Sequence, residues 1–301
     1  MTFRWRGNAA TDKAVWTNGL NWVDETGAAH IAADSPGSFA TALDTAIFDE
    51  ALAEGAASPL GAGPFERLAQ LRVGPSYNGG IGAVGDPLVV QVSDGVISSP
   101  SAQGIFLEGA TADGLDNVLH VITAPVLQLA GFWKRVRLFK GKITVPVGGE
   151  ILDLLVSYIG NKNSDVNLNI AVGSVTGSPV WKIFAGQVVS SANLGGCRVY
   201  VYGGSFTDNG GDPSSVVISG GIYVWNKGSL PIAQIMGGKV DGSAGSEARE
   251  YGRAEIYEGG VFDIDNGLDN IIQDPSTQAN GIYWYGGDLV VTSGVHLHVI
   301  H

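Results

Sequence analysis

Several carboxylates in the C-terminal half have a spacing that could support acid–base chemistry. Asp263 and Asp265 are two residues apart and would point the same way on a strand, and Asp208 or Asp241 could approach them from neighbouring turns of a repeat. A glycosidase needs two such acids about 5 to 10 Å apart in a groove. Each of these acids follows a glycine-rich corner, where aspartate is a common turn residue, and no apolar pocket is indicated that would raise one pKa. We therefore expect solvated turn carboxylates, and we assign no catalytic residue.

Two other patterns could bind a metal ion. The stretch from Asp263 to Asp269 resembles a calcium loop, but it lacks the glycine position and the distal glutamate of an EF-hand. In the C-terminal stretch SGVHLHVIH, His296 and His298 would share one face of a strand, where two imidazoles can hold one metal ion. The alternative is an exposed strand face at this end of the chain. The two histidines are the candidate metal ligands, and no cofactor is expected.

The basic side chains are concentrated in one short stretch, WKRVRLFKGK. It carries five of the 17 lysines and arginines of the chain. On an acidic protein, such a stretch could dock against an acidic partner surface such as a capsid shell. The alternative is a solvated outer strand whose charges prevent edge-to-edge pairing. The candidate interface residues here are Lys134, Arg135, Arg137, Lys140 and Lys142.

Composition limits the classes of function. The chain has 301 residues, 45 glycines, 15% charged residues, a net charge of −12 and one cysteine. An acidic chain repels phosphate backbones, so nucleic acid is not an expected partner, and a single cysteine excludes an intrachain disulfide. A nucleophile elbow, a dinucleotide-binding glycine motif and a phosphate loop are absent from the sequence. The first residues lack the apolar core of a secretory signal, and no apolar run is long enough to span a membrane.

The elements that must position these residues are indicated by a recurring glycine register. Three and five residues before each anchor glycine, and two residues after it, the side chains are apolar, which places them on one face of a strand. The residues predicted to point inward are Val136, Leu138 and Ile143 at Gly141; Trp181, Ile183 and Val188 at Gly186; Val199, Val201 and Phe206 at Gly204; Val216, Ile218 and Tyr223 at Gly221; Ala233, Ile235 and Val240 at Gly238; Ala254, Ile256 and Val261 at Gly259; and Ile282, Trp284 and Leu289 at Gly287.

This spacing favours a parallel β-helix. From Gly186 onward the anchors recur after 18, 17, 17, 21 and 28 residues, and periods of about 20 residues with β patterning indicate stacked turns. The fold class is therefore all-β, with a right-handed helix favoured and a β-sandwich with glycine hairpins as the alternative. We expect an N-terminal capping or attachment segment over residues 1–50 and a β-helical domain over 51–301, with irregular turns over 51–130 and regular turns over 131–301.

The first segment is rich in tryptophan. Trp5, Trp16 and Trp22 could cover the open end of the helix, where core side chains and strand edges would otherwise be exposed. The alternative is an aromatic platform that binds a sugar or a partner, so these three residues are also candidate interface residues.

A resemblance supplies a functional context. The segment FRWRGNAATDKAVWTNGLNWVD, followed by DSPGSFATALDTAIFDE, contains in order the motifs W-x-G, W, N-W, P and D-x-A-x-F. It resembles the opening of β-helical surface proteins, namely autotransporter-like passenger domains and tailed-bacteriophage virion proteins. With the glycine-paired repeat that follows, the chain as a whole is similar to the phage group.

The resemblance implies a non-enzymatic structural protein that decorates or cements the outer surface of a tailed-phage capsid. Its implied partners are the major capsid protein and further copies of the same chain, as a homotrimer, without nucleic acid or membrane. Its implied location is the capsid exterior, after synthesis in the host cytoplasm. The alternatives are a tail spike or fibre that binds host surface glycans and an autotransporter-like adhesin.

Overall fold

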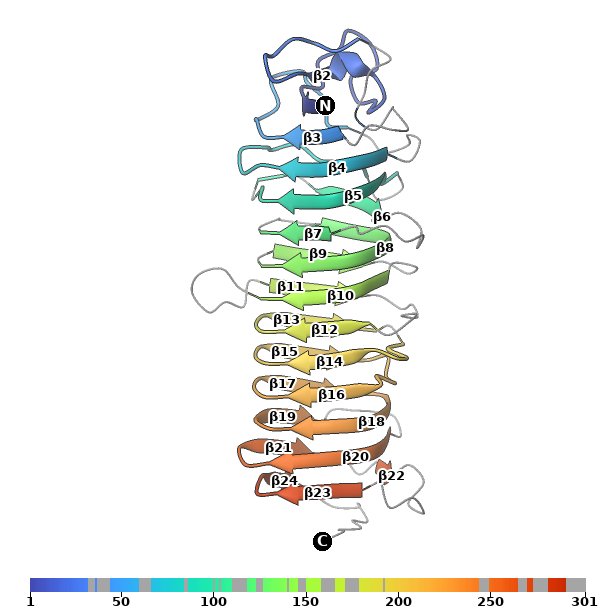
Figure 1. The fold of residues 1–301 in the computed structure, drawn as a ribbon, viewed down its shortest axis with the longest axis vertical. Coiled ribbons are helices and arrows are strands. Elements are labelled where there is room, and N and C mark those ends of the chain that lie inside the picture. The colour runs from blue at the N-terminus through green and yellow to red at the C-terminus, as the bar shows by residue number, and fades with distance from the viewer. Residues whose placement is uncertain are drawn as a thin grey trace. The chain divides into compact units, whose positions relative to one another are not determined.

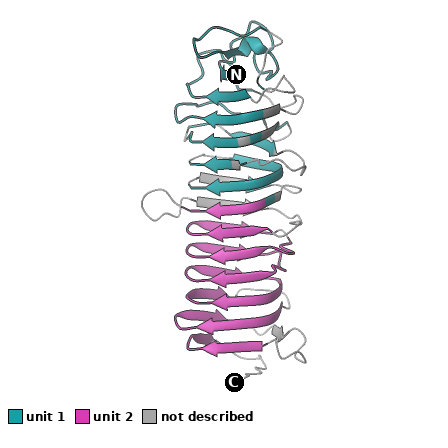
Figure 2. Ribbon diagram, in the orientation of Figure 1, with its two compact units in different colours: residues 1–151 teal, residues 152–301 magenta. Residues whose placement is uncertain are grey.

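The computed structural model shows an all-β chain built as a parallel β-helix (Figure 1). It describes residues 1–31, 36, 44–59, 66–83, 86–99, 101–102, 104–109, 118–122, 127–139, 141–145, 150–157, 166–170, 179–191, 193–243, 249–264, 270–272 and 281–290. Two compact units, residues 1–151 (unit 1) and 152–301 (unit 2), are coloured separately in Figure 2. No helix of the described residues has the length and apolar character needed to cross a membrane.

Unit 1 begins with a short antiparallel pair and continues with parallel strands. β1 pairs antiparallel with β2 and parallel with β3, and β3 pairs parallel with β4. The long strands β5 and β8 pair with β6 along one part of their length and with β7 along another, so each contributes to two faces of its turn. The elements are β1 (Thr2–Trp5), η1 (Gly19–Asn21), β2 (Trp22–Val23), β3 (Asp44–Phe48), β4 (Glu66–Val73), β5 (Leu88–Ile97), β6 (Ile105–Gly109), β7 (Val118–Val121), β8 (Leu127–Leu138) and β9 (Gly141–Val145).

Unit 2 contains two parallel sheets that alternate along the chain. The first sheet has the order β10–β12–β14–β16–β18–β20–β23, and the second has the order β11–β13–β15–β17–β19–β21–β24. The strands are β10 (Glu150–Val156), β11 (Val166–Ile170), β12 (Val180–Ile183), β13 (Gln187–Ser190), β14 (Arg198–Val201), β15 (Ser205–Asp208), β16 (Ser215–Ile218), β17 (Ile222–Trp225), β18 (Gly228–Ile235), β19 (Gly238–Asp241), β20 (Arg249–Tyr257), β21 (Gly260–Asp263), β22 (Asn270–Ile272), β23 (Gly281–Tyr285) and β24 (Asp288–Val290).

The core of unit 2 follows the register predicted from the glycines. Val199 and Val201 of β14 are aligned with Val216 and Ile218 of β16, and all four side chains are fully buried. Strands this short bury enough apolar surface only because each turn covers the next. The inward residues predicted at Gly186, Gly204, Gly221 and Gly238 are confirmed as buried.

At two later corners, the residues predicted to point inward are not all buried. Beyond Gly259 the corner is one residue longer, so Phe262 is aligned with Val240 and buried, while Val261 faces outward. At Gly287, Trp284 is in register with the buried Ile256, yet it is 63% exposed, and Leu289 is half-buried. The pattern of buried residues therefore changes at the corner that is one residue longer and at the last described turn.

Several corners of unit 2 require glycine. Gly204 has φ of +71°, and a Cβ added there would lie 2.4 Å from the carbonyl oxygen of Gly186 on the preceding turn. The same contact recurs between Gly221 and Gly204 and between Gly238 and Gly221. The glycine pairs are therefore the places where consecutive turns stack backbone on backbone, since no side chain fits between them.

The N-terminal strands belong to the first compact unit. Inside residues 1–50, β1 pairs in parallel with β3, and β3 pairs in parallel with β4. The N-terminal segment is consequently part of a compact unit that extends to residue 151, and the described strands of residues 66–121 stack in parallel like those that follow.

Candidate interaction surfaces

The three N-terminal tryptophans lie in the core of unit 1. Trp5, Trp16 and Trp22 are at most 3% exposed, and the ring of Trp22 contacts the other two edge-on at 4.9 and 4.6 Å between centroids. Each indole N–H donates to a backbone carbonyl, so the polar edge of each ring is satisfied. Buried indoles present no platform to a sugar or a partner, and all three pack near Phe48 of β3.

Asn21 organises the loop that carries these rings, a role that the sequence did not indicate. Its side chain is fully buried, accepts from the N–H of Ala9 at 3.0 Å, and donates to the carbonyls of Asp12 and Val15 at 2.9 and 3.1 Å. The asparagine of the N-W pair therefore ties together a loop that would otherwise leave buried backbone groups unpaired.

The basic stretch lies on the outer side of β8. Lys134, Arg135 and Arg137 are partly exposed there and alternate with the buried Trp133, Val136 and Leu138. Lys142 belongs to β9, but its side chain is outside the described residues, and Lys140 is itself outside them. The described part of the stretch is thus a half-exposed strand face. This agrees both with a docking surface and with a solvated outer strand.

Strand register extends this basic stretch into a row across unit 1. Each member is the Cα partner of the next on consecutive parallel strands, and all of them face outward. We call it the basic row: Arg4, Ile47, Arg72, Val96, His120 and Arg137. Cationic or titratable side chains therefore recur along one line on the surface of a protein whose net charge is −12.

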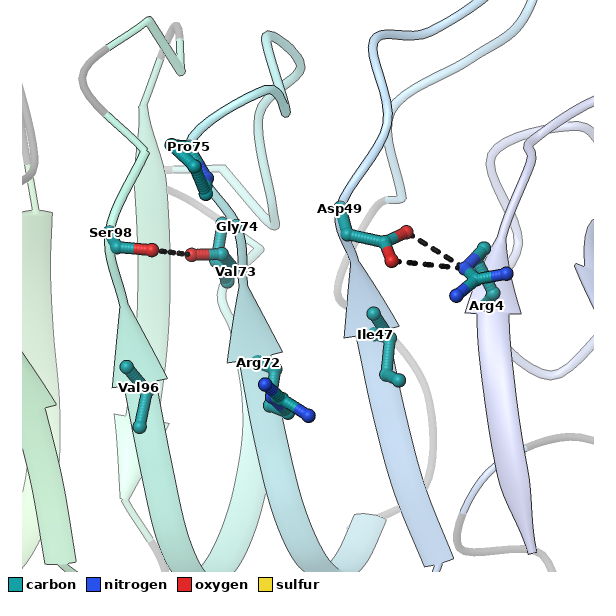
Figure 3. Close-up of a pocket in the computed structure, with 9 residues that line it drawn as sticks. All are labelled: Arg4, Ile47, Asp49, Arg72, Val73, Gly74, Pro75, Val96 and Ser98. Atoms are coloured by element: carbon teal, nitrogen blue, oxygen red, sulfur yellow. Dashed lines mark hydrogen bonds and ion pairs between the residues drawn. The ribbon is translucent and has the colours of Figure 1, made fainter. Parts of the chain in front are cut away.

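A surface depression of about 290 Å³ lies at the N-terminal end of the basic row (Figure 3). The Nε of Arg4 lies 2.9 and 3.1 Å from the two carboxylate oxygens of Asp49. Arg72 is exposed and forms no hydrogen bond or ion pair with the described residues. Ile47 and Val96 add apolar surface, and Ser98 lies on the far side.

These groups suit binding of an anion rather than nucleophilic chemistry. The guanidinium of Arg72 can hold a carboxylate or a phosphate in two parallel hydrogen bonds, and only the Nε of Arg4 is engaged by Asp49. The hydroxyl of Ser98 donates to the carbonyl of Val73 at 3.0 Å, so its proton points into the backbone and not toward a base.

Unit 2 carries a different surface, a row of exposed apolar and aromatic side chains on its first sheet. Phe184, Tyr202 and Met236 follow β12, β14 and β18 directly and are 40, 41 and 48% exposed, and Tyr285 at the end of β23 is 51% exposed. Neighbouring rings stack, at 4.6 Å between Phe184 and Tyr202 and at 4.8 Å between Tyr257 and Tyr285. Exposed apolar side chains that gather on one face are a feature of binding surfaces.

Of the carboxylates considered for catalysis, Asp208 is buried and held by hydrogen bonds. It accepts from the hydroxyl of Tyr223 at 2.5 Å and from the N–H groups of Gly210 and Gly211 at 3.0 and 2.7 Å. Burial raises the pKa of Asp208 to about 6, although these donors oppose the shift. The carboxylate is fully buried, as is Cys197. It stabilises the corner at Gly210 and Gly211 and is not accessible to a substrate.

Asp208 gives a testable pH dependence. Because its pKa is higher in the folded protein than the ordinary 3.8, folding favours the protonated form. Its contribution to the free energy of unfolding is complete below about pH 4, falls as the pH rises to about 6, and amounts to roughly 3 kcal/mol. Asp208→Asn, which keeps an acceptor for the two N–H groups, should remove this decline. Urea titrations of both proteins between pH 4 and 7 measure it, and parallel profiles would contradict it.

Two of the other candidate acids share one lysine as their ion-pair partner. Asp241 and Asp263 are aligned on β19 and β21, and both pair with Lys239, at 3.1 and 2.7 Å. Asp265 and Asp269, and likewise His296 and His298, lie outside the described residues. Within the described part of the chain, no group of three or more histidine, cysteine, aspartate or glutamate residues could hold a metal ion.

The chain was also compared with known proteins. No family model matches it, and neither a curated protein nor a solved structure matches it.

Proposed function

We propose that the chain is a non-enzymatic structural protein of a tailed-phage virion that decorates or cements the outer surface of the capsid. The resemblance of the N-terminal sequence to tailed-phage virion proteins suggests the phage assignment. The basic row of unit 1 is the structural observation that supports attachment to a capsid. A rigid sheet with cations in register offers a fixed line of charges to an acidic partner.

The partner in this proposal is an acidic surface of the major capsid protein. A carboxylate of that surface would bind to Arg72 in the depression, where Ile47 and Val96 supply apolar contact. Further carboxylates would meet Arg137 and its neighbours on β8. Because the protein is acidic overall, attraction confined to this row would also fix which side of the molecule meets the capsid.

Self-association and location belong to the same proposal. Decoration proteins that occupy local threefold axes assemble as homotrimers, and we extend this to the present chain by analogy. The protein would then reside on the exterior of the virion after synthesis in the host cytoplasm.

Charge reversal in the basic row tests the proposal. Arg72→Glu should weaken binding to purified expanded capsids about tenfold at moderate salt, because it replaces an attraction by a repulsion. Lys182→Glu on β12 of unit 2 changes the net charge equally and should bind as the unsubstituted protein does. Co-sedimentation over a salt series measures both. Equal weakening by the two substitutions, or no binding of the unsubstituted protein, would contradict the role of the row.

A further inference from the structure

The exposed row on the first sheet of unit 2 is interrupted at one turn. Phe184, Tyr202, Ser219 and Met236 occupy equivalent positions, since the N–H groups of Tyr202, Ser219 and Met236 each donate to the carbonyl of the last inward residue on the preceding turn. Three of these side chains are large and one is a serine. Ser219 is exposed, so no ring covers this position from a neighbouring turn.

On one side of the interruption, two tyrosines form a flat wall. The rings of Tyr200 and Tyr202 are within 9° of parallel, with centroids 6.3 Å apart. That distance is close to the spacing of about 6.7 Å between alternate residues of a strand, so the two parallel rings follow each other along the strand direction. Phe184 stacks on Tyr202 from the preceding turn, at an interplanar angle of 14°, and holds its plane.

The turn beside this wall carries only small outward side chains. Val217 of β16 is the Cα partner of Tyr200 on one side and of Gln234 on the other, and Ser219 lies between Tyr202 and Met236. Two strand spacings, or about 9.6 Å, separate the backbones of β14 and β18. One flat ring about 4 to 5 Å from each flank fits that interval.

Polar groups stand around the interval. Gln234 donates through its Nε2 to Glu255 at 2.9 Å, which fixes the amide and leaves its carbonyl oxygen as an acceptor. Glu255 is only 6% exposed, because Tyr257 donates to it and Arg253 pairs with it. The hydroxyl groups of Ser219 and the two tyrosines complete a polar rim around an aromatic wall.

We propose that this interval binds a neutral oligosaccharide. The apolar C–H face of one pyranose unit would lie against Tyr202, and the next sugar unit of the oligosaccharide would lie against Tyr200. A pyranose has one apolar face and a rim of hydroxyl groups, which matches a flat aromatic wall with polar groups at its edge and open solvent above. A nucleic acid base could also stack here, but its phosphates would meet a chain of net charge −12. The site goes beyond capsid decoration and shares no residue with the basic row.

Saturation-transfer NMR with maltohexaose, cellohexaose, chitohexaose and dextran tests the proposal. At least one probe should bind with millimolar affinity and receive saturation at its ring C–H protons. Tyr202→Ala should reduce the affinity about tenfold, the loss expected for one aromatic stacking contact. Ser219→Phe should abolish binding by filling the interval while it keeps the thermal midpoint, because it continues the stack of rings. Tyr285→Ala, which removes another exposed ring elsewhere in the row, is the matched control and should bind normally.

Two results would overturn the sugar site. One is the absence of binding of every probe to the unsubstituted protein. The other is undiminished binding by Ser219→Phe. If the probes do not bind and Ser219→Phe instead changes the oligomeric state or the attachment to capsids, this face is a protein interface. Failure of the basic-row proposal would leave these sugar measurements unaffected, since Arg72→Glu and Ser219→Phe alter different units.

Discussion

Replacement of Val201 by aspartate is expected to unfold unit 2. Val201 is fully buried and lies between Ile183 and Ile218 on the adjacent turns. The substitution removes apolar burial worth about 2 kcal/mol and places a carboxylate where no partner exists, which costs several kcal/mol more. The sum is a large part of the roughly 5 to 15 kcal/mol that stabilises an ordinary domain.

The neighbouring position provides the control. Tyr202→Asp changes an exposed side chain on the same strand end and should cost no more than about 1.5 kcal/mol, the value of its ring contact with Phe184. Circular dichroism and the urea midpoint distinguish the two variants. Equal tolerance of both substitutions would show that the inward register is wrong.

The second large effect is expected at the corner glycine Gly204. Gly204→Ala should destabilise the protein by roughly 2 to 5 kcal/mol, for two reasons. A φ of +71° costs a residue with a Cβ about 1 to 2 kcal/mol. The new Cβ would also lie 2.4 Å from the carbonyl oxygen of Gly186, so the backbone of one turn must move away from the next at a cost of about 1 to 3 kcal/mol.

Gly259→Ala separates these two contributions. Gly259 has a similar φ of +82°, but a Cβ there would meet no atom within 4 Å. This variant should lose only the conformational term of about 1 to 2 kcal/mol. The comparison is made by urea denaturation of both proteins at one pH. A loss at Gly259 as large as that at Gly204 would show that turns are not stacked backbone on backbone at the Gly204 corner.

The fold could be predicted from the sequence because one physical requirement is repeated. Each turn needs apolar residues at alternate positions and a glycine where its corner meets the previous corner, so Val199, Val201 and Phe206 recur in type at Gly186, Gly221 and Gly238. The pattern failed at Val261, where one additional residue shifts every following side chain to the other face.

Features that belong to a single turn could not be predicted. Arg249 is fully buried in register with Gly228, where it donates to the carbonyls of Trp225 and Gly242 and lies 5.2 Å from the Trp225 ring. Burial lowers the pKa of this guanidinium. A sequence pattern that assigns inward positions to apolar residues has no means of placing an arginine there.

The candidate surfaces show the same limit. The concentration of cations on β8 is visible in the sequence, but Arg4 and Arg72 are far from it along the chain. Their alignment with Arg137 depends on the register of β3, β4, β5 and β7, which lie before the first anchor of the glycine register at Gly141. The burial of Trp5, Trp16 and Trp22 likewise depends on packing against Phe48. The sequence left open whether these rings are buried as a cap or exposed as a binding platform.

The proposed decoration of a capsid by this β-helix is tested by the copy number of the protein on purified, expanded capsids saturated with it, measured by quantitative densitometry against the coat protein. The proposal predicts saturation at a near-integer ratio to the coat protein, with binding lost at high salt because the basic row is screened. Saturation at a handful of copies per particle would indicate a tail spike or fibre, and absence of binding would contradict a role on the capsid altogether.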